Sequence, residues 1–121
     1  MKINKDNELK EIDVKIDGVK NIKKRILIGP EDGSDNIVMR YFRIMPQGHT
    51  PHHKHDYEHV IKIEKGKGIA IDNQGCEHNI SSGMSLFITA NEPHQLRNPF
   101  DEPLEVICII RNVEEIAQKI S

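Results

Sequence analysis

The sequence predicts an all-β protein, either an antiparallel sandwich or a small barrel. Apolar residues alternate with polar ones at a period of two along most of the chain, as in strands with one buried face. Turn-forming segments rich in Gly, Pro, Asn and Asp separate these runs. Many short strands at a spacing of roughly ten residues are typical of sandwiches and barrels.

The predicted elements follow in chain order. Residues 1–10 are polar, and we expect them to fray. Residues 11–17, EIDVKID, alternate strictly and predict the first strand. Six further strands are predicted at RILI (25–28), NIVMRYFRI (36–44), HVIKIE (59–64), GIAID (68–72), MSLFIT (84–89) and LEVICII (104–110). We expect Met84 and Phe87 to be core residues or to line a pocket.

Only the C-terminal segment predicts a helix, because its apolar residues lie three and four apart. These residues are Val113, Ile116, Ala117 and Ile120. The whole chain, 1–121, has the length of one domain with a core of its own.

Composition excludes several classes of protein. With 36% apolar residues, 30% charged residues and a net charge of -2, the chain resembles an ordinary globular protein. We expect no nucleic-acid partner, and we interpret the basic run KNIKKR (20–25) as an exposed strand face. The sequence has no long apolar run and no signal-peptide pattern, which predicts a cytoplasmic protein without a membrane partner. Cys76 and Cys108 lie far apart and form no CxxC motif.

Five of the seven histidines lie in one stretch, HTPHHKHDYEH (49–59). If residues 53–64 form one strand, alternate side chains share a face, and the apolar members make that face the interior. The residues on this face are His53, His55, Tyr57, His59, Ile61 and Ile63. Each buried imidazole without a partner would cost roughly 1–3 kcal/mol, so a divalent metal ion is the simplest partner.

The neighbouring Glu58 is expected on the opposite face of this strand. A β-bulge would shift the register and exchange Glu58 for His59 among the inward residues, so either one remains a candidate ligand. Glu58 is also the candidate general base, reachable only through such a bulge. Tyr57 faces inward and is either a candidate acid or a core aromatic residue with its hydroxyl at the rim.

Two segments resemble the paired motifs of the cupin superfamily. Residues 48–66 resemble the first motif, with its HxH pair at His53 and His55 and with Gly66 closing it. His59 stands where that motif usually has glutamate.

Residues 83–98 resemble the second motif, in which Gly83, His94 and Asn98 match in position. Two positions depart from it, since Thr89 replaces the usual Pro and Asn91 the usual Gly. Asn is a mild replacement because it tolerates the left-handed backbone conformation.

The resemblance implies a double-stranded β-helix, the jelly-roll cupin barrel, here with a short C-terminal helix. It implies a metal site formed by His53, His55, His59 and His94, and we favour manganese, iron or zinc. It also implies a homodimer, formed either by packing of barrel faces or by exchange of an N-terminal strand, for which residues 11–17 are the candidate.

The function implied is that of a metal-dependent enzyme acting on a small carboxylate, dicarbonyl or sugar-like molecule. A non-catalytic module that binds or senses a small molecule or a metal is the alternative, because the sequence offers no clear inward carboxylate. A barrel in which the metal is only structural is a third reading. Arg97, three residues beyond His94, either pairs a ligand carboxylate at the barrel mouth or is solvated.

Overall fold

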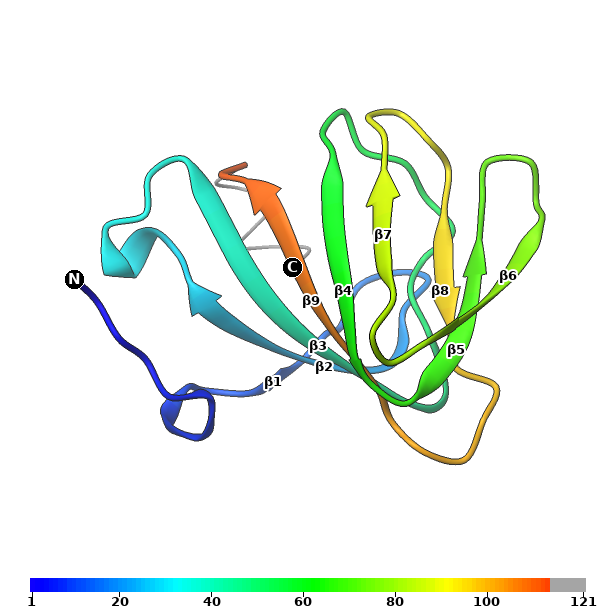
Figure 1. Ribbon diagram of the computed structural model, residues 1–121, viewed down its shortest axis with the longest axis horizontal. Helices are drawn as coiled ribbons and strands as arrows, with labels where there is room; N and C mark the ends of the chain where they lie inside the picture. Colours follow the sequence, from blue (N-terminus) through cyan, green and yellow to red (C-terminus); the bar gives the residue numbers. More distant parts are fainter. Residues whose placement is uncertain (114–121) are drawn as a thin grey trace.

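The computed structural model describes residues 1–113, which form a curled antiparallel sheet (Figure 1). Its strands are β1 (Ile12–Asp13), β2 (Lys20–Ile28), β3 (Ile37–His49), β4 (His59–Lys65), β5 (Lys67–Ile71), β6 (Glu77–Ser81), β7 (Ser85–Ile88), β8 (Gln95–Arg97) and β9 (Leu104–Arg111). Two short 3-10 helices, η1 (Asp6–Glu8) and η2 (Pro30–Asp32), precede β1 and follow β2. The predicted all-β class is confirmed. The predicted C-terminal helix falls mainly on residues 114–121, outside the described part of the chain.

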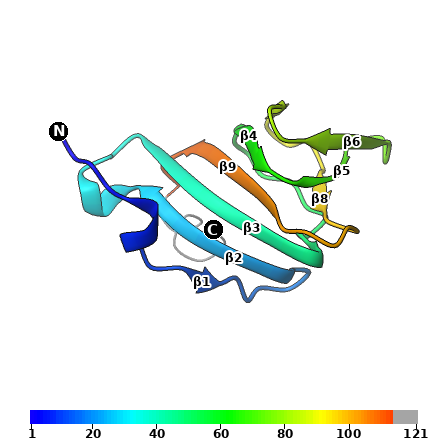
Figure 2. The same ribbon diagram turned by 60° about the horizontal axis from the view of Figure 1, so that its bottom comes forward.

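The long strand β3 joins the two halves of the sheet. The strand order is β6-β5-β8-β3-β9-β4-β7, with β2 also paired to β3 and β1 paired to β2. Figure 2 shows β1, β2, β3 and β9 as one layer, with β5, β6 and β8 curling over to the other side. The interior of the barrel lies between these layers.

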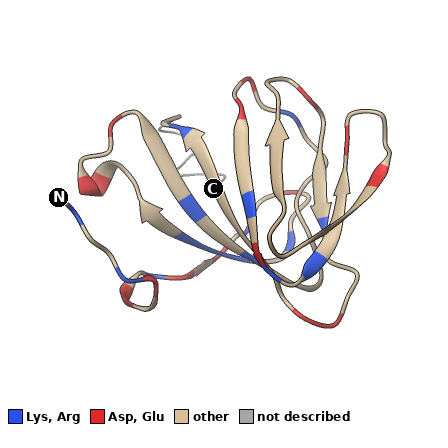
Figure 3. Cartoon of the chain, in the orientation of Figure 1, with Lys and Arg blue, Asp and Glu red and all other residues tan. Residues whose placement is uncertain are grey.

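The core follows the period of two that the sequence predicts. Along β9, Leu104, Val106, Cys108 and Ile110 are buried, and the residues between them are half-buried. Cys108 pairs with Arg40 of β3 and with Ile61 of β4, so all three side chains face the interior. Acidic and basic residues are interspersed over the strands and loops (Figure 3).

Two residues of the motifs adopt backbone conformations that suit their identity. Gly66, in the turn between β4 and β5, has φ +81°, and a Cβ atom there would collide with the carbonyl oxygen of Pro103. Asn91 has φ +65°, so it occupies the left-handed region where the motif usually has glycine.

The predicted strand over residues 53–64 is shorter than expected. β4 begins only at His59, and the preceding residues form a loop that makes a single bridge to His94. Burial nevertheless alternates through this loop: Lys54, Asp56 and Glu58 are exposed, whereas the odd-numbered residues between them are half-buried or buried. The side chains of residues 53–58 therefore face as predicted, although these residues do not form the predicted strand.

The N-terminal region also departs from expectation. Instead of fraying, the first ten residues are attached through Asn4, whose side-chain amide donates to Leu27 O at 2.9 Å and to Asp32 Oδ1 at 3.1 Å. Of the strand predicted at residues 11–17, only Ile12 and Asp13 pair, and they pair with β2 of the same chain.

Two residues that we expected in the interior are on the surface. Met84 is 46% exposed because it lies in the turn before β7, and Phe87 is 61% exposed because it lies on the face of β7 opposite the buried Ile88. No helix among residues 1–113 is long and apolar enough to cross a membrane.

Candidate metal centre

The four predicted histidine ligands come from two neighbouring segments. His53 and His55 lie in the loop between β3 and β4, His59 begins β4, and His94 directly precedes β8. The backbones of His53 and His94 exchange two hydrogen bonds, with N–O distances of 3.2 and 2.9 Å. In addition, the N–H of Asn91 donates to His55 O at 2.6 Å. These backbone contacts join the two motif segments at the histidines.

Three of the four histidines lie within chelating reach of one another. His53, His55 and His94 each offer a ring nitrogen, and these nitrogens all lie within 4.8 Å of one another. The Nε2 atoms of His53 and His55 are 3.2 Å apart. Nitrogens bound to one zinc ion at about 2.0–2.1 Å lie roughly 3–4 Å apart, so small ring rotations would suffice. We call these residues the three-histidine group.

His59 lies beside this group, but its ring nitrogens are not within the 4.8 Å spacing that the other three histidines share. Its ring centroid is 5.1 Å from that of His55 and 5.0 Å from that of His94. The side chain is buried, and its Nδ1 has no hydrogen-bond partner among the described residues. A buried ring nitrogen without a partner is costly, so His59 fits the role of a further ligand.

Burial keeps the imidazoles neutral. It lowers the pKa of His53 and of His55 to about 4, and that of His59 to about 3. Neighbouring histidines lower all three further, and Arg40 also lowers the pKa of His55 and of His59. The pKa of His94 is also lowered by burial. At neutral pH each ring thus has an unprotonated nitrogen, the form that binds a metal ion.

One hydrogen bond also sets the orientation of a ligand ring. His94 Nδ1 lies 2.7 Å from the carbonyl oxygen of Glu92, to which it donates in the neutral ring. The Nε2 lone pair then remains free, as in metal-bound histidines whose other nitrogen donates to a carbonyl. Together with the partnerless Nδ1 of His59, this donor set fits a divalent transition metal.

The two candidate catalytic residues lie in different surroundings. Tyr57 is buried and stacks on His55, with ring centroids 4.8 Å apart and an interplanar angle of 12°. Burial raises the pKa of Tyr57 to about 12, so its hydroxyl stays protonated at neutral pH. Glu58 is exposed, and β4 has no bulge at His59 that would turn Glu58 inward.

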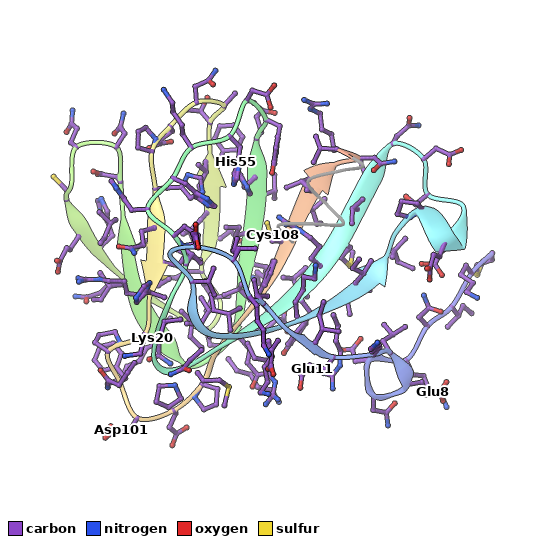
Figure 4. The ribbon with its side chains drawn as sticks, turned by 180° about the vertical axis from the view of Figure 1, so that it is seen from behind. Glu8, Glu11, Lys20, His55, Asp101 and Cys108 are labelled. Carbon is purple, nitrogen blue, oxygen red and sulfur yellow. The ribbon has the colours of Figure 1, made fainter. Side chains whose placement is uncertain are left out.

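A cavity of about 80 Å³ adjoins the histidines. In Figure 4, the labelled His55 marks the histidine segment and the labelled Cys108 marks β9. The polar lining of the cavity comes from His53, His59, His94, Thr50, Cys108 and Arg40. Apolar residues of β2, β3, β4, β7, β8 and β9 supply most of the remaining wall, and Val14, Ile16 and Val19 of the N-terminal segment complete it.

Sequence reasoning missed Arg40 and considered Arg97 instead. Arg97 forms an ion pair with Glu77 at 2.8 Å, on the outside of the barrel. Arg40 is buried and lines the cavity. The sequence did contain a signal that Arg40 faces inward. In an alternating strand, Arg40 shares a face with Phe42 and with Val38, which is buried.

Comparison with known proteins gives one family and several relatives. Residues 40–110 match the model of the family described as the cupin domain. Among solved structures, the polyketide cyclase RemF from Streptomyces resistomycificus superposes with a TM-score of 0.87 and 28% identity, over 92% of this chain and 79% of that chain.

Two curated proteins match over part of their length. The HTH-type transcriptional activator RhaS from Escherichia fergusonii is 40% identical over 50 residues, which cover 41% of this chain and 18% of that protein. A 1-methylthio-D-xylulose 5-phosphate methylsulfurylase from Rhodospirillum rubrum is 30% identical over 76 residues, covering 60% of this chain and 46% of that protein. The chain thus spans less than half the length of either relative.

Proposed function

Because the chain belongs to the cupin domain family, we propose that it is a metal-dependent enzyme that acts on a small molecule in its interior cavity. The observation that carries this proposal is the convergence of three ring nitrogens within 4.8 Å of one another. Burial keeps the three-histidine group neutral and therefore able to bind metal. In this proposal His59 completes the site, and the metal is manganese, iron or zinc.

The chemistry that such an ion supplies is polarisation of a carbonyl or carboxyl oxygen. Neutral imidazoles leave the charge of a divalent ion uncompensated, which favours oxygen ligands that are anionic or bidentate. We therefore propose a small carboxylate, dicarbonyl or sugar-like substrate. Tyr57, whose ring lies against those of His55 and His59 and whose hydroxyl is protonated, is the proposed proton donor.

A non-catalytic module that binds a small molecule or a metal is the second candidate. Among the described residues that line the cavity, none is Asp or Glu, so no carboxylate base adjoins it. Product formed from a dicarbonyl or hydroxy acid and lost in His94→Ala would favour the enzyme, whereas saturable binding without product would favour the module.

Metal content tests the site itself. We expect mass spectrometry of the tag-free protein, after reconstitution, to find near one manganese, iron or zinc per chain. His94→Ala and His59→Ala should each lower retention at least tenfold, because each removes a ligand nitrogen. Glu58→Ala is the control and should retain the metal, since Glu58 is exposed.

Either of two results would count against this proposal. Reconstituted wild-type protein without bound metal would refute the metal site as a whole. Full retention in His59→Ala, together with loss in His94→Ala, would reduce the site to the three-histidine group.

A further inference from the structure

Arg40 carries a positive charge into the wall of the proposed substrate cavity. It lies on the inward face of β3, opposite Ile26 of β2 and Cys108 of β9, and is only 4% exposed. The guanidinium carbon lies 5.0 Å from the ring centroid of Phe42, and Nη2 donates to Cys108 Sγ at 2.9 Å. Phe42 and Cys108 line the same cavity as the histidines, which places the guanidinium beside that space.

The charge of Arg40 has no counterpart in the described part of the chain. Each of the other four arginines has a carboxylate within 4.0 Å: these are Arg25, Arg43, Arg97 and Arg111. Arg40 has none among residues 1–113, and its Nε has no hydrogen-bond partner there. A thiol accepts hydrogen bonds only weakly. Since a buried charge is costly unless it is paired, the cavity is complementary to an anion.

A second buried cation lies near Arg40. Lys24, within the basic run that we expected to be exposed, is 4% exposed and faces inward opposite Phe42. Burial, followed by the charge of Arg40, lowers the pKa of Lys24 to about 8. Lys24 lines a separate pocket that also contains Glu31 and Asp32. In the cavity beside the histidines, Arg40 is the cationic residue, and no acidic residue is among the described lining.

We infer that the cavity takes a small carboxylate-bearing molecule and that Arg40 is the residue that selects its carboxylate. This inference rests on the proposed function and narrows its substrate class from carboxylates, dicarbonyls and sugar-like molecules to carboxylates. The planar guanidinium matches a carboxylate better than a neutral carbonyl, and its remaining N–H donors are available. A cavity of about 80 Å³ suits a molecule of a few heavy atoms, since drug-sized ligands occupy roughly 300–1,000 Å³.

The test follows the side chain of Arg40 directly. Full-length protein labelled with ¹⁵N-arginine is freed of metal by dialysis and titrated with pyruvate, with its neutral methyl ester, and with inorganic phosphate. The Nε–H signal of Arg40 is assigned by its loss in Arg40→Met. We expect pyruvate to shift this signal saturably and to bind at least tenfold more tightly than the ester.

The variants separate this role from a general effect of charge. Arg40→Met should weaken pyruvate binding at least tenfold, and Arg40→Lys should weaken it less, because the charge remains without the planar group. Arg97→Met is the matched control and should bind pyruvate as the wild type does, since Arg97 is paired with Glu77. Circular dichroism verifies that each variant is folded, and if Arg40→Met does not fold, Arg40→Lys and the ester comparison still decide.

Three results would overturn the inference. The first is equal binding of pyruvate and its ester, or no shift of the Arg40 signal by pyruvate. The second is a shift caused by phosphate alone. The third concerns the chain's own Glu114 and Glu115, which follow Val113 in the sequence. Pyruvate binding that appears only in the Glu114→Gln, Glu115→Gln double variant would mean that one of these two carboxylates is the anion that pairs with Arg40.

Failure of this inference can be distinguished from failure of the proposed function. Pyruvate binding at Arg40 in a protein that takes up no metal would refute the metal site and leave the anion site in place. Metal uptake without pyruvate binding would refute the role of Arg40 and leave the metal site in place.

Discussion

At the scale of single residues, the histidines link stability to pH. In the unfolded chain they take up protons near pH 6.5, whereas His53 and His55 resist protonation down to a pKa of about 4 and His59 down to about 3. Between these values the unfolded state binds more protons than the native state. The free energy of unfolding is therefore expected to fall as the pH drops below about 6.5, by up to roughly 1.4 kcal/mol per pH unit for each histidine.

Urea unfolding of the metal-free protein between pH 7.5 and 4.5 measures this slope. His59→Gln should flatten it, because one titrating group is removed. A free energy of unfolding that does not change with pH in the wild type would contradict the prediction.

The sequence was informative about the histidines and less so about the arginines. The HxH pair and the spacing to His94 predicted a cluster that the structure brings together in His53, His55 and His94. Arg40 was overlooked because a charged residue is usually exposed, and the alternation of its strand was not extended to it.

At the scale of the elements, the turn between β4 and β5 depends on Gly66. A side chain there must both adopt φ +81° and displace the backbone of Pro103. We expect Gly66→Ala to lower the free energy of unfolding by several kcal/mol, about 1–2 kcal/mol from the left-handed conformation and the remainder from the collision.

Gly75 provides a matched control for this prediction. Its φ is +78°, yet a Cβ atom there meets nothing within 4 Å. Gly75→Ala should therefore cost only the conformational part, about 1–2 kcal/mol, in the same urea unfolding experiment. Equal losses in the two variants would show that contact with Pro103 is unimportant.

The start of β4 shows why the direction of the side chains was easier to predict than the pairing of the strand. Alternation in the sequence reports which side chains are buried, and this pattern continues from His53 to Ile63. Strand pairing requires in addition a neighbour with free backbone groups. Before His59 the backbone instead contacts His94 and Asn91 at single points, which alternation does not reveal.

At the scale of the whole molecule, an apolar row crosses the outward face of the sheet. Phe87 of β7 pairs with Val60 of β4, which pairs with Ile109 of β9, which in turn pairs with Met39 of β3. Val60 is 52% exposed and Phe87 is 61% exposed. A row without charges can contact a second copy of itself across a two-fold axis without needing opposite charges to match. We expect this row to be the contact surface of the homodimer predicted from the sequence.

Light scattering tests this prediction. We expect a mass of twice 13.9 kDa for the wild type, and Val60→Glu should shift the equilibrium at least tenfold toward monomer because it places a charge in the apolar row. Met84→Glu is the control, since Met84 is also an exposed apolar residue but lies outside the row. A monomeric wild type at every concentration tested would refute the prediction.

The overall barrel was predictable because its signals are repeated along the chain. The alternating runs and intervening turns predicted most strands, and β9 begins and ends within one residue of expectation. The N-terminal segment was predicted less well, because its alternation in EIDVKID serves to cover the chain's own cavity with Val14 and Ile16. From alternation alone, a short segment cannot be assigned either to a paired strand or to the cover of a cavity in its own chain.

The bridge between His53 and His94 has a consequence for the order of events during folding. These residues are 41 positions apart in the sequence, and their ring nitrogens meet only after the intervening strands have formed and closed the loop. Before that closure, a newly made chain offers an ion the histidines of residues 49–59 without His94 beside them. At the proposed metal site, tight capture is therefore expected to be a late step that only a correctly closed barrel completes, so metal occupancy would mark chains that have finished folding.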